Sequence, residues 1–177
     1  MRTAMLVLVL VVAFSVVAVG GEAEQELIEA FLDPATLVTG IYDAVSSAAG
    51  GTPDWDFVRL HFSSEALIVL RTSKEESRLL DLDSFIQDFV DFYARIDPTK
   101  NGFEETVVSV RVLEYGNIAH CYVVYEAAIT GSERAPQRGL DSWHLMQRDG
   151  RWWVVSVVND SEPAAGPVPE EVFKSGD

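Results

Sequence analysis

The chain has 177 residues, of which 48% are hydrophobic, and this is enough for one well-buried core and short for two. Its 28 acidic residues outnumber its 13 basic residues and give a formal net charge of -15 at pH 7. The length therefore predicts a single domain. A chain of this charge repels phosphate backbones, and no basic stripe offsets the repulsion, so we expect no binding to nucleic acid.

Residues 1–20 have the layout of a secretory signal peptide. Arg2 precedes an apolar run from Met5 to Val19, small residues follow, and the run is short for a membrane span. We therefore expect cleavage after Gly20 or Ala23 and a secreted or periplasmic protein that keeps no stable membrane anchor. An uncleaved N-terminal anchor is the alternative. Residues 21–33 are predicted to form an acidic spacer.

Cys121 is the single cysteine of the sequence, and it lies inside a strand pattern. One cysteine forms no intramolecular disulfide, so the fold must depend on its core even in an oxidising compartment. A lipid anchor would require a cysteine just behind the apolar run. We expect Cys121 to be a small buried hydrophobe.

Two helices and a strand are predicted after residue 32. Asp33 and Pro34 fit the N-cap and first position of a helix, and apolar residues recur at i, i+4 and i+8. These residues are Leu37, Ile41 and Val45. Asp54 is expected to cap a short second helix that carries Trp55, Val58 and Phe62 inward, and residues 65–71 have a strand pattern.

Residues 81–97 give the strongest helical pattern of the chain. Asp81, Asp83 and Ser84 are alternative N-caps. One face of this helix is an aromatic and aliphatic stripe of Phe85, Ile86, Phe89, Phe92, Tyr93 and Ile96. A stripe of this width is typical of a core-facing helix rather than of a cofactor site.

A β-hairpin is predicted over residues 104–129, with a type II′ turn at Gly116 and Asn117. A regular register places one face of this hairpin in the core. That face consists of Val108, Val110, Val112, Cys121, Val123, Tyr125 and Ala127.

A second hairpin covers residues 138–160 and turns at Asp149 and Gly150, which suit a type I′ turn. A regular register sets Trp143 opposite Ser156. The face predicted to be interior carries Trp143, Leu145, Trp152, Val154 and Val158, with the polar residues Asp141, Ser156 and Asp160. The face predicted to be outer carries Leu140, Ser142, His144, Met146, Arg148, Arg151, Trp153, Val155, Val157 and Asn159.

Asp141 is the candidate acid or base. A carboxylate on an apolar face loses hydration, which raises its pKa toward neutrality. The alternative is a structural carboxylate that accepts backbone N–H bonds or pairs with Arg138. Ser156 has no base that the sequence can place beside it, so a nucleophilic role is unsupported. The three histidines have no metal-ligand spacing and no cofactor motif is present, so we expect neither metal nor cofactor.

The order of elements resembles that of the nuclear transport factor 2-like superfamily, also called SnoaL-like or cystatin-like. The stretches that carry this resemblance are LVTGIYDAVSSAAGGTPDWDFVRLHFSSEALIVL, DSFIQDFVDFY, GNIAHCYVVYEA and RGLDSWHLMQRDGRWWVVSVVNDSE, within residues 34–162. The resemblance implies an α+β fold in which a cone-shaped, curved antiparallel sheet wraps two to three helices around a pocket. Residues 163–177 are then a flexible, proline-rich tail.

Enzymes of that superfamily include ketosteroid isomerase, scytalone dehydratase, polyketide cyclases and limonene epoxide hydrolase. The resemblance implies that Tyr42 corresponds to the helix tyrosine that bonds a substrate oxygen in the isomerase, beside Asp141 as an acid. The sequence shows no second strand carboxylate facing the same cavity.

Three hypotheses for the function remain open at this stage. The first is an exported domain that binds a small apolar or amphipathic ligand in a pocket lined by Tyr42, Trp55, Phe89, Tyr125, Asp141, Trp143, Trp152 and Ser156. The second is an isomerase, dehydratase or cyclase that uses Asp141 and Tyr42. The third is a homodimer or partner-binding module that uses the outer sheet face at Tyr122, Met146, Trp153, Val155 and Val157.

Overall fold

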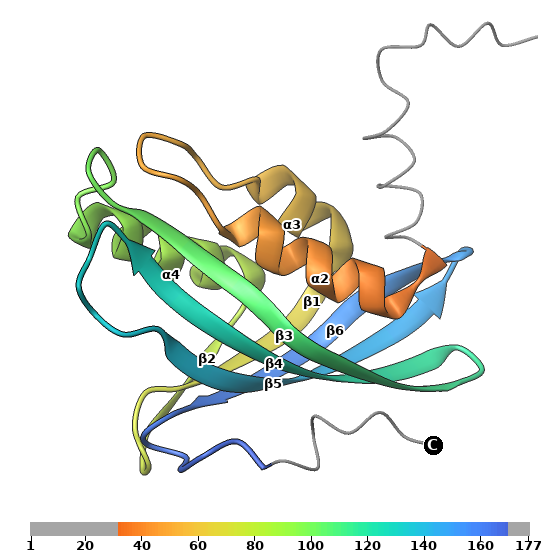
Figure 1. Ribbon diagram of the computed structural model, residues 1–177. Coiled ribbons are helices and arrows are strands. Elements are labelled where there is room, and N and C mark those ends of the chain that lie inside the picture. The colour runs from red at the N-terminus through yellow and green to blue at the C-terminus, as the bar shows by residue number, and fades with distance from the viewer. Residues whose placement is uncertain (1–31, 170–177) are drawn as a thin grey trace, which may run out of the picture.

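The computed structural model describes residues 32–169, so the predicted signal peptide, most of the spacer and the end of the tail lie outside it. Within this range three helices precede or interrupt the strands and the chain ends on a four-strand meander (Figure 1). The elements are α2 (Pro34–Val45), α3 (Trp55–His61), β1 (Phe62–Arg71), β2 (Ser77–Leu80), α4 (Leu82–Arg95), β3 (Gly102–Tyr115), β4 (Ile118–Thr130), β5 (Gln137–Arg148) and β6 (Arg151–Ser161).

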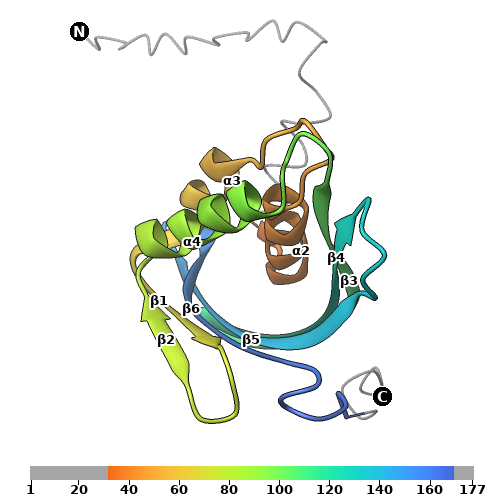
Figure 2. The ribbon, with the colours of Figure 1, turned by 90° about the vertical axis from the view of Figure 1, so that its left-hand side faces the viewer.

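The six strands form one sheet in the order β2-β1-β6-β5-β4-β3. The sheet curves without closing, α2 lies inside the curve and α4 lies across its open side (Figure 2). This arrangement confirms the predicted α+β, cone-like fold. One detail differs, because β1 pairs with β6 in parallel and the sheet is therefore mixed rather than wholly antiparallel. The short edge strand β2 was not predicted.

Aspartates begin all three of these helices, as the sequence indicates. The Asp33 side chain accepts a hydrogen bond from the Thr36 amide at 2.7 Å, and Pro34 takes the first helical position. Asp54 caps α3 in the same way. Of the three candidates for α4, Asp81 is the N-cap, and its carboxylate accepts from the Ser84 amide at 2.8 Å.

Both predicted hairpin turns are confirmed. Tyr115 pairs with Ile118 across Gly116 and Asn117, and Gly116 takes a φ of 59°, which suits a type II′ turn. At the second turn Asp149 and Gly150 both have positive φ, 55° and 77°, as a type I′ turn requires.

A β-bulge in β3 changes the first hairpin's predicted register. The pairing shifts between Val107 and Ser109, which leaves Val108 as an extra residue on β3. Val108, predicted to be in the core, is 42% exposed. Beyond the bulge Val107 and Glu105 face the same side as their partners Tyr125 and Ala127.

A second bulge changes the predicted register of the last hairpin in the part that lies away from its turn. Leu145 pairs with Val154, but His144 pairs with Ser156, so Val155 is the extra residue. From this point the predicted faces of β6 exchange. Ser156, Val158 and Asp160 leave the inner face, and Val157 and Asn159 replace them opposite Trp143 and Asp141.

The core lies between α2, α4 and the concave face of the sheet. Its most buried side chains include Leu37, Ile68, Val123, Leu145, Trp152 and Val154. Cys121 is free and fully buried there, as predicted, and burial raises the pKa of its thiol to about 12. None of the helices formed by residues 32–169 has both the length and the apolar character of a membrane span.

Two adjacent tryptophans test which face of β6 is interior. Trp152 is 1% exposed, whereas Trp153 lies on the outer face with the Arg151 guanidinium 3.8 Å from its ring centroid. Trp152→Ala should lower the free energy of unfolding by about 3–5 kcal/mol because it opens a core cavity. Trp153→Ala should cost less than about 1.5 kcal/mol. Urea denaturation measures both, and equal losses would contradict this assignment of faces.

Candidate functional site

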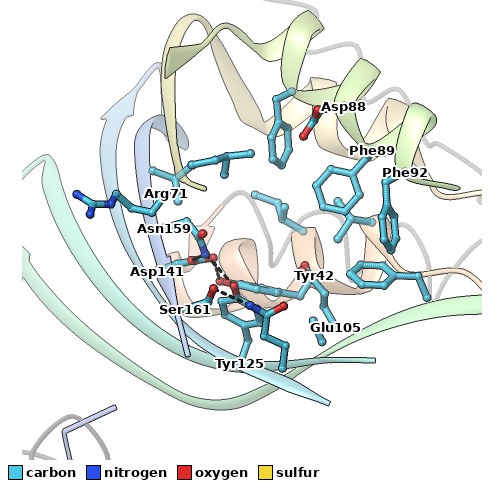
Figure 3. Close-up of a pocket in the computed structure, with 18 of the residues that line it drawn as sticks. Tyr42, Arg71, Asp88, Phe89, Phe92, Glu105, Tyr125, Asp141, Asn159 and Ser161 are labelled. Atoms are coloured by element: carbon cyan, nitrogen blue, oxygen red, sulfur yellow. Dashed lines mark hydrogen bonds between the residues drawn. The ribbon is translucent and has the colours of Figure 1, made fainter. Parts of the chain in front are cut away.

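A cavity of about 360 Å³ lies between α2, α4 and the concave face of the sheet. It is found at the end of the sheet where β1, β4 and β6 finish and where β3 and β5 begin. One part of its wall is formed by aromatic side chains and another part by a few polar side chains (Figure 3). Such a mostly apolar hollow with a few convergent polar groups is typical of small-molecule sites.

The apolar wall comes mainly from α4. Phe85, Phe89 and Phe92 project from this helix, and Phe103 of β3 meets Phe92 with 4.9 Å between ring centroids. The sequence pattern predicts that this stripe is part of the core. Phe85 is buried, but Phe89 and Phe92 are half-buried and face the cavity (Figure 3). The stripe therefore forms both the edge of the core and the wall of the cavity.

The polar end of the cavity is centred on Asp141, which is 7% exposed. The Tyr42 hydroxyl, from α2, donates a hydrogen bond to Asp141 Oδ2. Tyr42 in turn accepts a hydrogen bond from Trp143 Nε1 at 3.1 Å. Helix and sheet thus meet through a continuous set of hydrogen bonds at the wall of the cavity (Figure 3).

Asn159 completes this set from β6. Its amide nitrogen donates to Asp141 Oδ1 and to the Tyr125 hydroxyl, each at 2.7 Å. Tyr125 lies across Gly139 of β5, where a β-carbon would come within 2.4 Å of its hydroxyl oxygen. Glycine at position 139 is therefore what allows Tyr125 to reach Asn159.

The environment of Asp141 raises its pKa to about 6. Burial is the main cause, and the hydrogen bonds from Tyr42 and Asn159 oppose it. The structure differs from the alternative pairing with Arg138, because Arg138 lies on the other face of β5 and pairs with Glu126, while Asp141 accepts from Tyr42 and Asn159. Burial and the Asp141 charge also raise the pKa values of Tyr42 and Tyr125, so both hydroxyls keep their protons at neutral pH.

Glu105 is a second carboxyl group on the cavity wall, which the sequence did not reveal. Its pKa is raised to about 8, first by burial and then by the charge of Asp141. The bulge at Val108 brings it inward, whereas an uninterrupted alternation from Val110 turns it outward. The conclusion that the cavity holds one strand carboxylate was therefore wrong.

The structure brings five of the predicted site residues together and leaves three elsewhere. Those that line the cavity are Tyr42, Phe89, Tyr125, Asp141 and Trp143. Trp55 packs on Phe89, with 5.9 Å between ring centroids, but does not line the cavity. Trp152 is buried in the core. Ser156 lies on the outer face, where its hydroxyl is 2.9 Å from His144 Nδ1.

The outer sheet face also differs from its predicted composition. Val157 is 3% exposed and belongs to the core, so it leaves the predicted partner surface. His120 and His144 lie side by side on this face, with ring centroids 4.4 Å apart and ring planes tilted by 37°. Among residues 32–169 no group of three or more His, Cys, Asp or Glu side chains is arranged to hold a metal ion.

Comparisons with known proteins show the fold. No family model matches the chain, and no curated protein matches it in sequence. An NTF2-like protein of unknown function from Pseudomonas putida is 11% identical, with a TM-score of 0.54 over 89% of this chain and 94% of that one. A protein of unknown function with a cystatin-like fold, from Nostoc punctiforme, is 8% identical, with a TM-score of 0.54 over 80% of this chain and 92% of that one. These likenesses confirm the predicted NTF2-like, cystatin-like fold.

Glu105 should make the protein less stable as the pH rises. Its folded pKa, about 8, lies above its ordinary value of 4.5, so its contribution to stability is complete below pH 4.5 and is lost as the pH rises through 8. In urea denaturation from pH 5 to 8, Glu105→Gln should flatten the decline by up to about 1.4 kcal/mol per pH unit. Glu104→Gln, at the exposed neighbouring position, is the control and should show the same decline as the wild type. If Glu105→Gln also shows the wild-type decline, the raised pKa of Glu105 is contradicted.

Proposed function

We propose that this domain binds a small amphipathic organic molecule in the cavity between α4 and the sheet. The observation that carries the proposal is the combination of an aromatic wall with a hydrogen-bonded polar end centred on Asp141. The wall provides apolar contact area, and the polar groups fix orientation. The apolar run of residues 1–20 supports the further proposal that the domain acts outside the cytoplasm.

The protein's own hydrogen bonds hold the polar groups in position. Tyr42 and Asn159 satisfy both oxygens of Asp141, and Trp143 holds Tyr42 in place. A ligand that enters therefore meets fixed side chains and does not have to order them, which lowers the entropic cost of binding.

Filling the cavity tests this proposal. Ala127 lines the cavity, and its neighbour Ala128 alternates to the other face of β4. N-phenyl-1-naphthylamine, an uncharged fluorescent aromatic probe, should bind the wild type with increased emission. Ala127→Phe should weaken its binding more than about tenfold by occupying the same volume, whereas Ala128→Phe should leave it unchanged. Equal binding to all three proteins would place the probe elsewhere and overturn the proposal.

A second candidate is acid–base catalysis within the same cavity. The observation that favours it is a pair of carboxyl groups whose pKa values, about 6 for Asp141 and about 8 for Glu105, lie on either side of neutrality. Asp141 then takes a proton from a carbon acid, and the protonated Glu105 donates a hydrogen bond.

Proton exchange at a carbon acid tests the catalytic candidate directly. With 2-tetralone in D₂O, NMR should show α-deuteration faster than in buffer alone. Asp141→Asn should reduce the enzymatic rate by at least about 100-fold while circular dichroism shows a folded protein. Exchange at the buffer rate with the wild type would exclude Asp141 as a base for this class of substrate.

A further inference from the structure

Two carboxyl groups face one small space in a cavity that is otherwise largely apolar. Asp141 lies on β5 and Glu105 on β3, and both line the cavity. The two oxygens of Asp141 accept hydrogen bonds from Tyr42 and Asn159. Among residues 32–169 no donor is hydrogen-bonded to the Glu105 carboxyl group. Glu105 is thus the acidic group with free bonding capacity at this end.

Aromatic rings surround the same end of the cavity. The Tyr42 ring lies 5.6 Å from that of Tyr125 and 5.8 Å from that of Trp143, measured between centroids. The faces of such rings attract cations, most strongly where water is excluded. The Asp141 carboxylate and the surrounding rings are therefore groups that attract a cation, inside a chain of net charge -15.

We propose that the polar end of the cavity binds a protonated amine, so that the ligand is an amphipathic amine with an apolar body against the phenylalanines of α4. This assignment rests on the proposed ligand-binding function and names the chemical class of that ligand. The ammonium group lies between the Glu105 and Asp141 carboxyl groups, over the rings of Tyr42 and Tyr125.

The arginines at the mouth of the cavity offer the competing site, one for an anion. Arg71, Arg78 and Arg95 line this part of the cavity. Arg78 is already paired with Asp88 at 2.6 Å, and Arg71 bonds the carbonyl oxygen of Ser73. Pairs at an exposed rim contribute little, whereas a cation beside desolvated carboxylates offsets their lost hydration. This comparison favours a cation beside Asp141 and Glu105, at the polar end of the cavity, over an anion beside the arginines.

Amine binding must then release a proton. At pH 7 the Glu105 carboxyl is mostly protonated in the empty cavity, since its pKa is about 8. A cation beside it lowers this pKa, and the proton passes from Glu105 to solvent. The other titratable groups around Glu105 are Tyr42 and Asp43 of α2, Tyr93 of α4, Tyr125 of β4 and Asp141 of β5.

Three probes that share one ring system test the proposal by isothermal titration calorimetry. They are 2-naphthylmethylamine, which is a cation at pH 7, neutral 2-naphthylmethanol, and the anion 2-naphthoate. The amine should bind at least about tenfold more tightly than the alcohol. Heats measured in phosphate and in Tris should differ, because these buffers take up the released proton, approaching one per amine bound, with different enthalpies.

Two variants test whether Glu105 causes the proton release and the preference for the amine. Glu105→Gln should remove the proton release and most of the preference for the amine over the alcohol. Glu104→Gln removes an acid of the same type from the exposed neighbouring position and should behave like the wild type. Unfolding curves in urea establish that both variants are folded before they are titrated.

The outcomes separate this inference from the proposed function. If the amine and the alcohol bind equally, or if amine binding releases no proton, the inference is wrong and ligand binding stands. If 2-naphthoate binds most tightly, the inference is wrong and the arginines of the mouth select an anion. If none of the three probes binds, the proposed ligand-binding function fails together with it.

Discussion

The hydrogen bond from Tyr42 to Asp141 joins the helical layer to the sheet across 99 residues of sequence. A carboxylate inside a protein is costly unless donors replace its lost water. Here the donors come from two different elements, Tyr42 on α2 and Asn159 on β6. Because α2 must lie where its tyrosine reaches β5, the same contact that forms the polar end of the cavity also fixes the helix on the sheet.

The part of this arrangement that the sequence predicts is the part governed by unbroken periodicity. Strand β5 carries no extra residue, so counting back from the turn at Asp149 places Asp141 and Trp143 on the inner face correctly. The caps and the tight turns have specific residue signatures, and the structure confirms them. Tyr42 is predicted only through the family resemblance, because the apolar stripe of α2 is defined by Leu37, Ile41 and Val45.

The missed residues lie beyond the two bulges. Val108 and Val155 are valines next to other valines, with good strand propensity and no glycine to mark an irregular residue. Each bulge lies between a tight turn and the cavity. An assignment of inward and outward residues that starts at the turn is therefore wrong for the residues that line the cavity. Each bulge also turns a polar side chain inward, Glu105 on β3 and Asn159 on β6. The irregularities that defeat pattern analysis are thus the ones that build the polar end.

The carboxyl groups of the cavity are only partly balanced by the protein's own donors. Burial alone disfavours ionised Asp141, and that charge disfavours ionised Glu105, so near neutral pH the pair lowers stability in a way that an apolar or amide pair would not. The surrounding core buries Trp152, Leu37 and Ile68 almost fully, and this apolar burial acts in the opposite, stabilising direction. A group that donates hydrogen bonds or carries positive charge would relieve the imbalance. In the proposed complex the ammonium group of the ligand would fill this role, and its apolar body would lie against the phenylalanines of α4.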